Sequence, residues 1–268
     1  MARVRLVRFT AVTAGVLVLA AAVATQPVET PRSADVQTVA ASATPPTNAA
    51  KIFKWGNKQW GDEFVNPLSS MWKVNRPATV QNQHGMLTLD TTGGAVTATV
   101  QDHWRKYGRW EARVRARQYG SGGTPYRVLW ELVPGGVYHC AARNIVLSEY
   151  KIGTNTASMA LRNLPNANFT DTKALPLSDN QFHTYAVEVT PDHISWFVDT
   201  RVIMTERRAP SRTGALYSAR FRLVAPAGAT MNRGRMQMDW VRYYTLERPN
   251  AQSIEAPQAT LGTYADAC

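Results

Sequence analysis

The sequence predicts an all-β fold, a two-sheet sandwich or jelly roll of short antiparallel strands. In residues 108–117, GRWEARVRAR, apolar and charged side chains alternate, which is the period of a half-buried strand. Residues 184–206, TYAVEVTPDHISWFVDTRVIMTE, read as three strands separated by Pro-Asp and Asp-Thr breaks. No stretch of ten or more residues carries an apolar helical stripe with caps. Many short strands with turn residues between them are typical of β-sandwiches and jelly rolls.

The rest of the chain continues this pattern. Short runs of apolar and β-branched residues, bounded by Gly, Pro, Asn and Asp, predict further strands. These runs are residues 85–92, 95–101, 127–133, 144–150, 219–225 and 235–246. The sequence contains no internal repeat, so a single sandwich is expected rather than a repeat architecture.

The first 24 residues read as a secretory signal peptide. Three arginines stand within the first eight residues, a mostly apolar run follows, and Ala-Val-Ala ends the segment. The apolar run is shorter than the ~20 residues that a membrane span needs, which argues against the alternative of a single anchor. We therefore expect cleavage near Ala24, a secreted chain and no stable membrane span.

Composition divides the remainder into three parts. Residues 25–50 are rich in Pro, Thr and Ala and hold no aromatic residue, so they are expected to be a flexible tether. Aromatic residues begin soon after Lys51, and residues 51–247 are long enough for one sizeable core. Residues 248–268 are expected to form a loose C-terminal tail.

The charge balance is strongly basic. The chain has 30 Lys and Arg against 19 Asp and Glu, a formal net charge of +11. Most of the basic residues are arginines, which either reflects a GC-rich genome or indicates affinity for polymers that bear carboxylate or phosphate groups. No basic run is interleaved with aromatic residues, so nucleic acid is not expected as a partner.

Two cysteines, Cys140 and Cys268, are present. An even number of cysteines in an exported chain favours a disulfide, which would tie the C-terminal tail to the segment before residues 144–150. The five histidines and two cysteines show no metal-ligand spacing, so no cofactor is expected.

Five segments in order resemble glycoside hydrolase family 16, the secreted β-glucanases with a concanavalin A-like jelly roll. They are DEFVNPLSSMWKV at 62–74, YGRWEARVRA at 107–116, RVLWELVP at 127–134, FHTYAVEVTPDHISWFVD at 182–199 and MQMDWVRYY at 236–244. The resemblance runs from about Trp60 to Tyr244 and implies that fold for most of the chain.

The family's catalytic signature, E-x-D-x-x-E, falls on residues 144–149. By this resemblance Asn144 takes the position of the nucleophile, Val146 that of the assisting Asp, and Glu149 that of the acid/base. An odd step along a regular strand would turn Glu149 to the opposite face. The sequence therefore predicts a β-bulge between Asn144 and Glu149.

Two of the three catalytic groups are replaced in this chain. Retaining hydrolysis needs one carboxylate that attacks the anomeric carbon and one carboxylic acid that protonates the leaving oxygen. Asn144 carries no charge and can only hydrogen-bond a sugar hydroxyl, while Val146 adds apolar bulk. The sequence thus indicates that the family's mechanism is lost and that Glu149 is the remnant of an acid/base.

Five further residues are candidates for substrate or metal binding. Trp130 is either a sugar-stacking platform or a core residue, and Glu131 either replaces the missing carboxylate or pairs with an arginine. Arg162 stands where the family has a cleft histidine; it would favour an acidic saccharide or is simply a surface residue. His183 matches the family motif F-H-x-Y and has either a binding or a structural role. Asp239 matches an acidic residue near the structural calcium of some relatives.

The resemblance and the substitutions together predict a non-hydrolytic binder of a polysaccharide, either neutral or acidic. We expect the protein to be secreted and monomeric, either free or associated with the cell wall. The alternative is an active hydrolase or transglycosylase that pairs Glu149 with a relocated carboxylate, Glu131 or Glu206. A third class is a structural surface protein. The first hypothesis depends on the absence of a carboxylate at Asn144, whereas the second requires another carboxylate to take its place.

Overall fold

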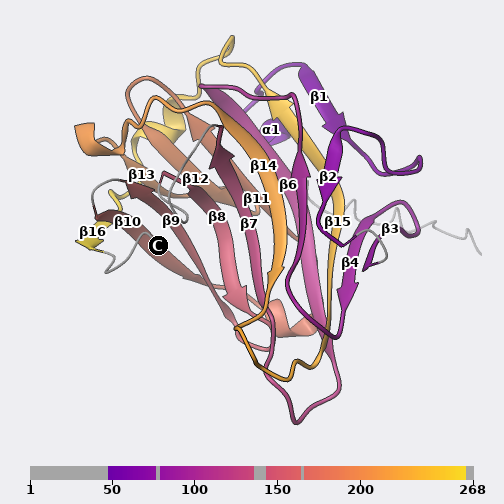
Figure 1. Ribbon diagram of the computed structural model, residues 1–268. Helices are drawn as coiled ribbons and strands as arrows, with labels where there is room; N and C mark the ends of the chain where they lie inside the picture. Colours follow the sequence, from indigo (N-terminus) through magenta and orange to yellow (C-terminus); the bar gives the residue numbers. More distant parts are fainter. Residues whose placement is uncertain (1–47, 77–78, 136–142, 164–165, 264–268) are drawn as a thin grey trace, which may run out of the picture. The chain divides into compact units, whose positions relative to one another are not determined.

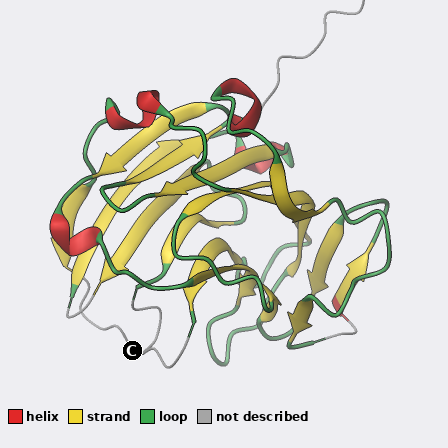
Figure 2. Ribbon diagram, turned by 90° about the horizontal axis from the view of Figure 1, so that it is seen from above, coloured by secondary structure: helices red, strands yellow, loops and turns green. Residues whose placement is uncertain are grey.

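The computed structural model describes residues 48–76, 79–135, 143–163 and 166–263, all within one compact unit, Thr44–Cys268. Two antiparallel sheets make up this part of the chain, and the helices are single turns at its periphery (Figures 1 and 2). The all-β sandwich predicted from the sequence is confirmed. Within the described residues no helix is long and apolar enough to cross a membrane.

We name the sheets after their central strands. The β6 sheet runs, in spatial order, through β13 (Arg201–Glu206), β12 (Ile194–Val198), β11 (His183–Val189), β6 (Gly108–Tyr119), β15 (Arg233–Tyr244), β4 (Leu87–Thr91) and β3 (Val80–Asn82), and β1 (Lys58–Asp62) also pairs with β15. The β8 sheet runs through β16 (Thr260–Thr263), β10 (Ala167–Ala174), β9 (Thr156–Asn163), β8 (Ile145–Lys151), β7 (Arg127–Pro134), β14 (Tyr217–Val224), β5 (Val96–Val100) and β2 (Trp72–Val74). The short helices are α1 (Ala49–Ile52), η2 (Leu177–Asp179), η3 (Ala209–Ser211) and η4 (Ala251–Ile254).

One apolar core lies between the sheets. On β6 the predicted alternation holds: Trp110, Ala112, Val114 and Ala116 are buried in this core. Their partners on the β8 sheet come from the same alternation on β7, β8 and β14. Because each strand gives every second side chain to the core, the side chains between them form the two outer faces of the sandwich.

The N-terminal segment covers part of the outer face of the β6 sheet. The backbone amides of Ala49 and Ala50 donate hydrogen bonds to Oε1 of Glu111, and Trp55 packs edge-on against Tyr244. Glu111 is fully buried, and this burial raises its pKa to about 7 even though the backbone hydrogen bonds lower it. A side chain predicted on the charged face of β6 is thus enclosed by the segment that precedes β1.

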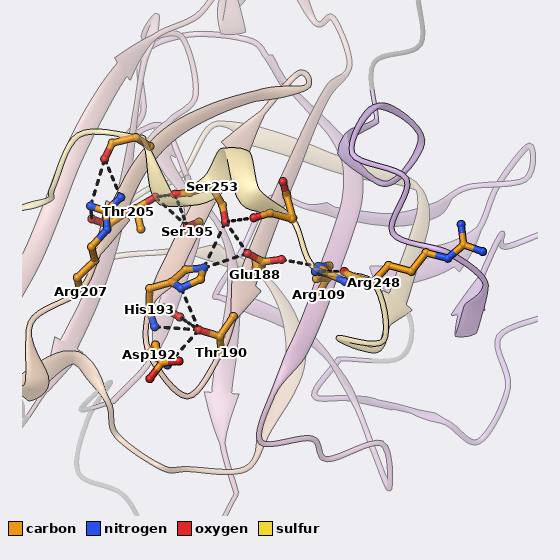
Figure 3. A network of polar contacts seen from close by, with 12 residues as sticks. Arg109, Glu188, Thr190, Asp192, His193, Ser195, Thr205, Arg207, Arg248 and Ser253 are labelled. Carbon is orange, nitrogen blue, oxygen red and sulfur yellow. Dashed lines mark hydrogen bonds and ion pairs between the residues drawn. The ribbon is translucent and has the colours of Figure 1, made fainter.

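The C-terminal segment covers more of the same face through a buried polar network (Figure 3). Ser253 donates to Glu188 (2.6 Å), and the Ser253 carbonyl accepts hydrogen bonds from the hydroxyls of Ser195 and Thr205. Arg109 and Glu188, both about 1% exposed, form an ion pair at 2.5 Å. Burial alone would raise the pKa of Glu188, but hydrogen bonds from His193 and Ser253 and the charge of Arg109 hold that pKa below its ordinary value.

The segment from residue 248 onward, which was predicted from the sequence to be a loose tail, packs against the sheets. The Arg248 carbonyl accepts a hydrogen bond from Arg109, and β16 pairs with β10. Residues 248–263 are therefore part of the sandwich. Cys140 and Cys268, the predicted disulfide, lie outside the described residues, as do residues 1–24 and most of 25–50.

Candidate functional site

The candidate site occupies the outer face of the β8 sheet. On β7, Val128, Trp130 and Leu132 point into the core, so Leu129 and Glu131 point outward. The same alternation turns Arg220 and Arg222 of β14 and Ala160 and Arg162 of β9 outward. We call these outward side chains, together with Arg127, Asn144, Val146 and Glu149, the Glu149 face.

The predicted bulge is present in β8. On the β7 side, Trp130 pairs with Ser148 whereas the next residue, Glu131, pairs with Val146, so β8 holds one extra residue. On the β9 side, Val146 and Glu149 are three residues apart, but their partners, Ala160 and Ser158, are only two apart. The extra residue restores the side-chain phase and places Val146 and Glu149 on the same face. The bulge is thus retained although two of the three catalytic residues are replaced.

Asn144, at the nucleophile position, is bound to Glu131. It immediately precedes β8 and is 3% exposed, and its Nδ2 donates a hydrogen bond of 2.6 Å to Oε2 of Glu131. Its carbonyl accepts a hydrogen bond from the backbone N–H of Arg162 (3.2 Å).

Glu131 is a buried carboxylate held by two arginines. Its Oε1 accepts a hydrogen bond from Nε of Arg220 (2.8 Å) and lies 3.6 Å from Nη1 of Arg222. Burial lowers the pKa of Arg222, while the charge of Glu131 raises it. The alternative interpretation of Glu131, pairing with arginine, is the one found in the structure, and its contact with Asn144 is an addition that the sequence did not reveal.

Glu149 has two arginine neighbours as well. Its Oε1 lies 3.1 Å from Nη1 of Arg127, and its Oε2 lies 3.8 Å from Nη2 of Arg162. The Glu149 side chain is 17% exposed, so water or a ligand reaches it. Arg162, which the sequence left either as a cleft residue or as a surface residue, therefore lies beside Glu149.

Val146 lies in a small apolar cluster on this face. It contacts Leu129 and Ala160, and Val224 packs against the group. Where the family pattern has an acid that assists the nucleophile, this chain has a hydrocarbon floor between Glu131 and Glu149. No proton can be shared at this point, because valine has no titratable group.

Two predicted binding residues are not on the Glu149 face. Trp130 is fully buried in the core and stacks on Phe221, with ring centroids 4.6 Å apart, so its interpretation as a sugar platform is wrong. His183 belongs to β11 of the other sheet, where its Nδ1 contacts Asp199 Oδ2 at 2.5 Å and its ring packs near Tyr185. His183 therefore has the structural role, and its assignment to substrate binding is wrong.

Two other acidic residues are also remote from Glu149. Glu206 ends β13 of the β6 sheet, is fully buried, and pairs with Arg208. Asp239 lies on β15, where its Oδ2 is 2.7 Å from Nη1 of Arg113. Within the described residues no cluster of three or more His, Cys, Asp or Glu occurs. The calcium role of Asp239 stays a prediction.

Three residues of this face were not predicted from the sequence as members of the site. Arg127, Arg220 and Arg222 lie in segments that were predicted as strands, but only the pairing of β14 with β7 brings the last two to Glu131. The alternation in ARFRLVA predicts that the two arginines share a face, but not which carboxylate they contact.

Comparison with known proteins places this geometry in context. Residues 153–242 match the model of "Glycosyl hydrolases family 16", a match that begins just after the strand of Glu149. A comparison with curated proteins finds no match. The resemblance to glycoside hydrolase family 16 predicted from the sequence is confirmed over that segment.

Solved structures share the fold at low sequence identity. The laminarinase catalytic domain of Thermotoga maritima is 14% identical, over 70% of this chain and 98% of that chain, with a TM-score of 0.60. SCLam, described as a non-specific endo-β-1,3(4)-glucanase of family 16, is 15% identical over 70% and 91% of the chains, with a TM-score of 0.59. A structure from a study of endo-acting O-glycanases that human gut bacteria express to initiate mucin breakdown is 18% identical over 74% and 92%, with a TM-score of 0.58. These matches show that the chain has the family 16 sandwich fold.

Proposed function

We propose that the Glu149 face of this family 16-like sandwich binds a polysaccharide that carries acidic groups, and that the protein does not cleave this polysaccharide. The observation that carries the proposal is the state of Asn144. The residue at the nucleophile position is a neutral amide, and its hydrogen bond to Glu131 occupies the carboxylate that lies beside it. A binding face remains, while the nucleophile is absent.

Hydrolysis with retention needs a free carboxylate and a protonated carboxylic acid on opposite sides of the scissile bond. Both carboxylates of the Glu149 face already form hydrogen bonds or ion pairs with neighbouring side chains. Glu131 accepts from Asn144 and Arg220, and Glu149 forms ion pairs with Arg127 and Arg162. An ion pair requires the carboxylate form, whereas a general acid must carry a proton that it can donate. The contacts support sugar recognition by hydrogen bonds rather than proton transfer.

The charge of the Glu149 face supports an acidic polymer. Four arginines, Arg127, Arg162, Arg220 and Arg222, surround two carboxylates on this face. Guanidinium groups bind carboxylate and sulfate oxygens in a bidentate way, and the excess positive charge attracts a polyanion. Secretion and association with the cell wall would bring the chain to such polymers, and we infer that it acts as a monomer.

An active hydrolase or transglycosylase is the second candidate. The observation that favours it is the 2.6 Å contact between Glu131 and Asn144, because it puts a carboxylate next to the nucleophile position. Glu206, the other carboxylate considered, is excluded by its position on the β6 sheet. In this mechanism Glu131 would have to leave Arg220 to reach a sugar.

The test is binding of polygalacturonate and of neutral laminarin to the natural protein and to two variants. We expect Arg162→Ala to weaken polygalacturonate binding by about tenfold, since it removes one charge-assisted contact. Glu149→Gln should bind about as well as the natural protein, because the amide still accepts hydrogen bonds. Salt should weaken binding, since exposed charges are screened over ~10 Å at 0.1 M.

Arg201→Ala is the matched control, since Arg201 is an exposed arginine at the start of β13 in the other sheet. It should bind as the natural protein does. Equal loss in Arg162→Ala and Arg201→Ala would contradict binding at the Glu149 face. Salt-independent binding to laminarin alone would contradict the acidic polymer, and no binding to any glycan would favour a structural surface protein.

A further inference from the structure

The outer face of the β6 sheet carries a second concentration of positive charge. We call Arg113, Arg115 and Arg117 of β6 and Arg233 and Arg235 of β15 the arginine patch. The two strands pair directly, and the Cα partner of Arg235 is Arg117. The patch occupies the end of β6 beyond Arg109 and Glu111, which the terminal segments cover.

The charges of the patch are not balanced. Asp239 pairs with Arg113, and Asp90 pairs with both Arg233 and Arg235. Among the described residues, no carboxylate lies within ion-pair distance of Arg115 or Arg117. Five guanidinium groups therefore face two carboxylates, an excess of three positive charges on one face of two strands.

The placement of Arg117 opposite Arg235 is unfavourable in the unliganded protein. Like charges directly opposite each other on paired strands are destabilising. Natural sequences keep such arrangements where function requires them, at a cost in stability. An anionic ligand that lies across the two strands would remove this repulsion.

Aromatic rings hold the guanidinium groups in place. Arg117, Arg233 and Arg235 lie 5.0–5.1 Å from the ring centroid of Tyr119. Arg113 and Arg115 lie 4.5 and 4.4 Å from that of Phe182. Stacking on a ring restricts the side chains, so less conformational entropy is lost when they bind an anion.

We propose that the arginine patch is a second binding surface, distinct from the Glu149 face, for a polysaccharide that bears carboxylate or sulfate groups. Alternate residues on a strand are ~6.6–6.8 Å apart, so the three arginines of β6 leave the strand as a row at even intervals. Such a row fits a linear polymer with regularly repeated acidic groups. The two sheets face opposite directions, so one molecule of this protein can contact two polymer chains.

Nucleic acid and membrane fit the patch less well. Single-stranded nucleic acid stacks its bases on free aromatic faces, whereas Tyr119 and Phe182 are capped by guanidinium groups. Insertion into a bilayer uses exposed apolar side chains. The large hydrophobic side chains that are exposed among the described residues, such as Ile52 and Val65, do not belong to the arginine patch.

The experiment compares polygalacturonate, dextran sulfate and neutral dextran as probes. We expect the double variant Arg115→Gln/Arg117→Gln to bind the two acidic polymers roughly tenfold more weakly at the patch than the natural protein does, while the Glu149 face of the same variant still binds. Its matched control, Arg201→Gln/Arg212→Gln, removes two exposed arginines outside the patch and should bind as the natural protein does. Neutral dextran should not bind to the patch.

A second measurement separates binding from folding. Arg117→Gln should raise Tm by about 1–2 °C, because it relieves the repulsion from Arg235, while it weakens polymer binding. A purely structural arginine would lower Tm when removed. A lowered Tm with unchanged affinity would therefore overturn the proposal.

The outcomes distinguish the two faces. If Arg162→Ala binds like the natural protein while Arg115→Gln/Arg117→Gln does not, the patch inference stands and binding at the Glu149 face fails. If Arg115→Gln/Arg117→Gln retains full affinity, the patch inference fails whatever the Glu149 face does. Tighter binding to a single-stranded oligonucleotide, or to vesicles that contain phosphatidylserine, than to either acidic polymer would also overturn it.

Discussion

Trp130→Ala is expected to destabilise the protein by about 3–5 kcal/mol, the usual cost of deleting a fully buried tryptophan. The indole is buried between the sheets and stacks on Phe221. Its removal would leave a cavity beneath β7, the strand that carries Glu131 on its outer side. Urea denaturation gives the free energy of unfolding directly.

Trp130→Phe is the matched control. It keeps an aromatic ring against Phe221 and removes an indole N–H that has no hydrogen-bond partner among the described residues, so it should cost less than the alanine variant. The folded Trp130→Phe protein should bind polygalacturonate as the natural protein does. If Trp130→Ala kept full stability but lost glycan binding, the indole would be a sugar platform and its core position would be contradicted.

The buried Glu111 should make stability fall as the pH rises. The pKa of Glu111 is raised to about 7 in the folded protein, above its ordinary value of 4.5 in the unfolded chain, so the folded protein holds a proton more tightly. The loss of folding stability that comes from ionising this buried carboxyl is absent below about pH 4.5, grows between about pH 4.5 and 7, and is complete above about pH 7. Between about pH 5 and 8 we expect this group to cost about 2–3 kcal/mol.

The measurement is urea denaturation of the natural protein and Glu111→Gln across this range. Glutamine imitates the protonated acid and still accepts from Ala49 and Ala50, so the variant should lack this part of the pH dependence. All other side chains are the same in the two proteins, so their contributions cancel in the difference. The acids with lowered pKa values, Glu63, Asp90 and Glu188, lose their contribution only as the pH falls below their ordinary range. Parallel curves for the two proteins would contradict the burial of a titrating Glu111.

The fold was predictable because residues 110–117 of β6 alternate regularly between apolar and charged side chains. Trp110, Ala112, Val114 and Ala116 define one face of the strand, and the structure buries all four. The bulge was predictable for a different reason, since the family pattern needs residues 144 and 149 on the same face and a regular strand cannot place them there. The first prediction depends on local geometry alone, whereas the second depends on local geometry together with the family resemblance.

The orientation of β7 was not predictable from RVLWELV. Both of its faces are apolar, so the sequence does not show whether Trp130 or Glu131 points into the core. The structure decides this by pairing β7 with β14, which supplies arginines to Glu131 and Phe221 to Trp130. Contacts between strands that are some ninety residues apart, such as Glu131 with Arg220, leave no local signal.

The cover over the β6 sheet was missed for a related reason. The alternation correctly puts Arg109 and Glu111 on the outer face of β6. It cannot show that residues 49–55 and 246–254 pack over them, because those segments have no strand or helical period of their own. A buried charge on the outer face of a sheet is therefore found only when the segments that cover it are seen.

The proposed function depends on the absence of a working nucleophile at Asn144. The most direct measurement is the release of reducing ends when the natural protein is incubated with laminarin, mixed-linkage β-glucan and polygalacturonate, with product analysis by mass spectrometry. We predict no products from any of the three, while polygalacturonate still binds. Products that form with the natural protein and disappear in both Glu149→Gln and Glu131→Gln would contradict the account, because the two carboxylates would then act as an acid and a nucleophile.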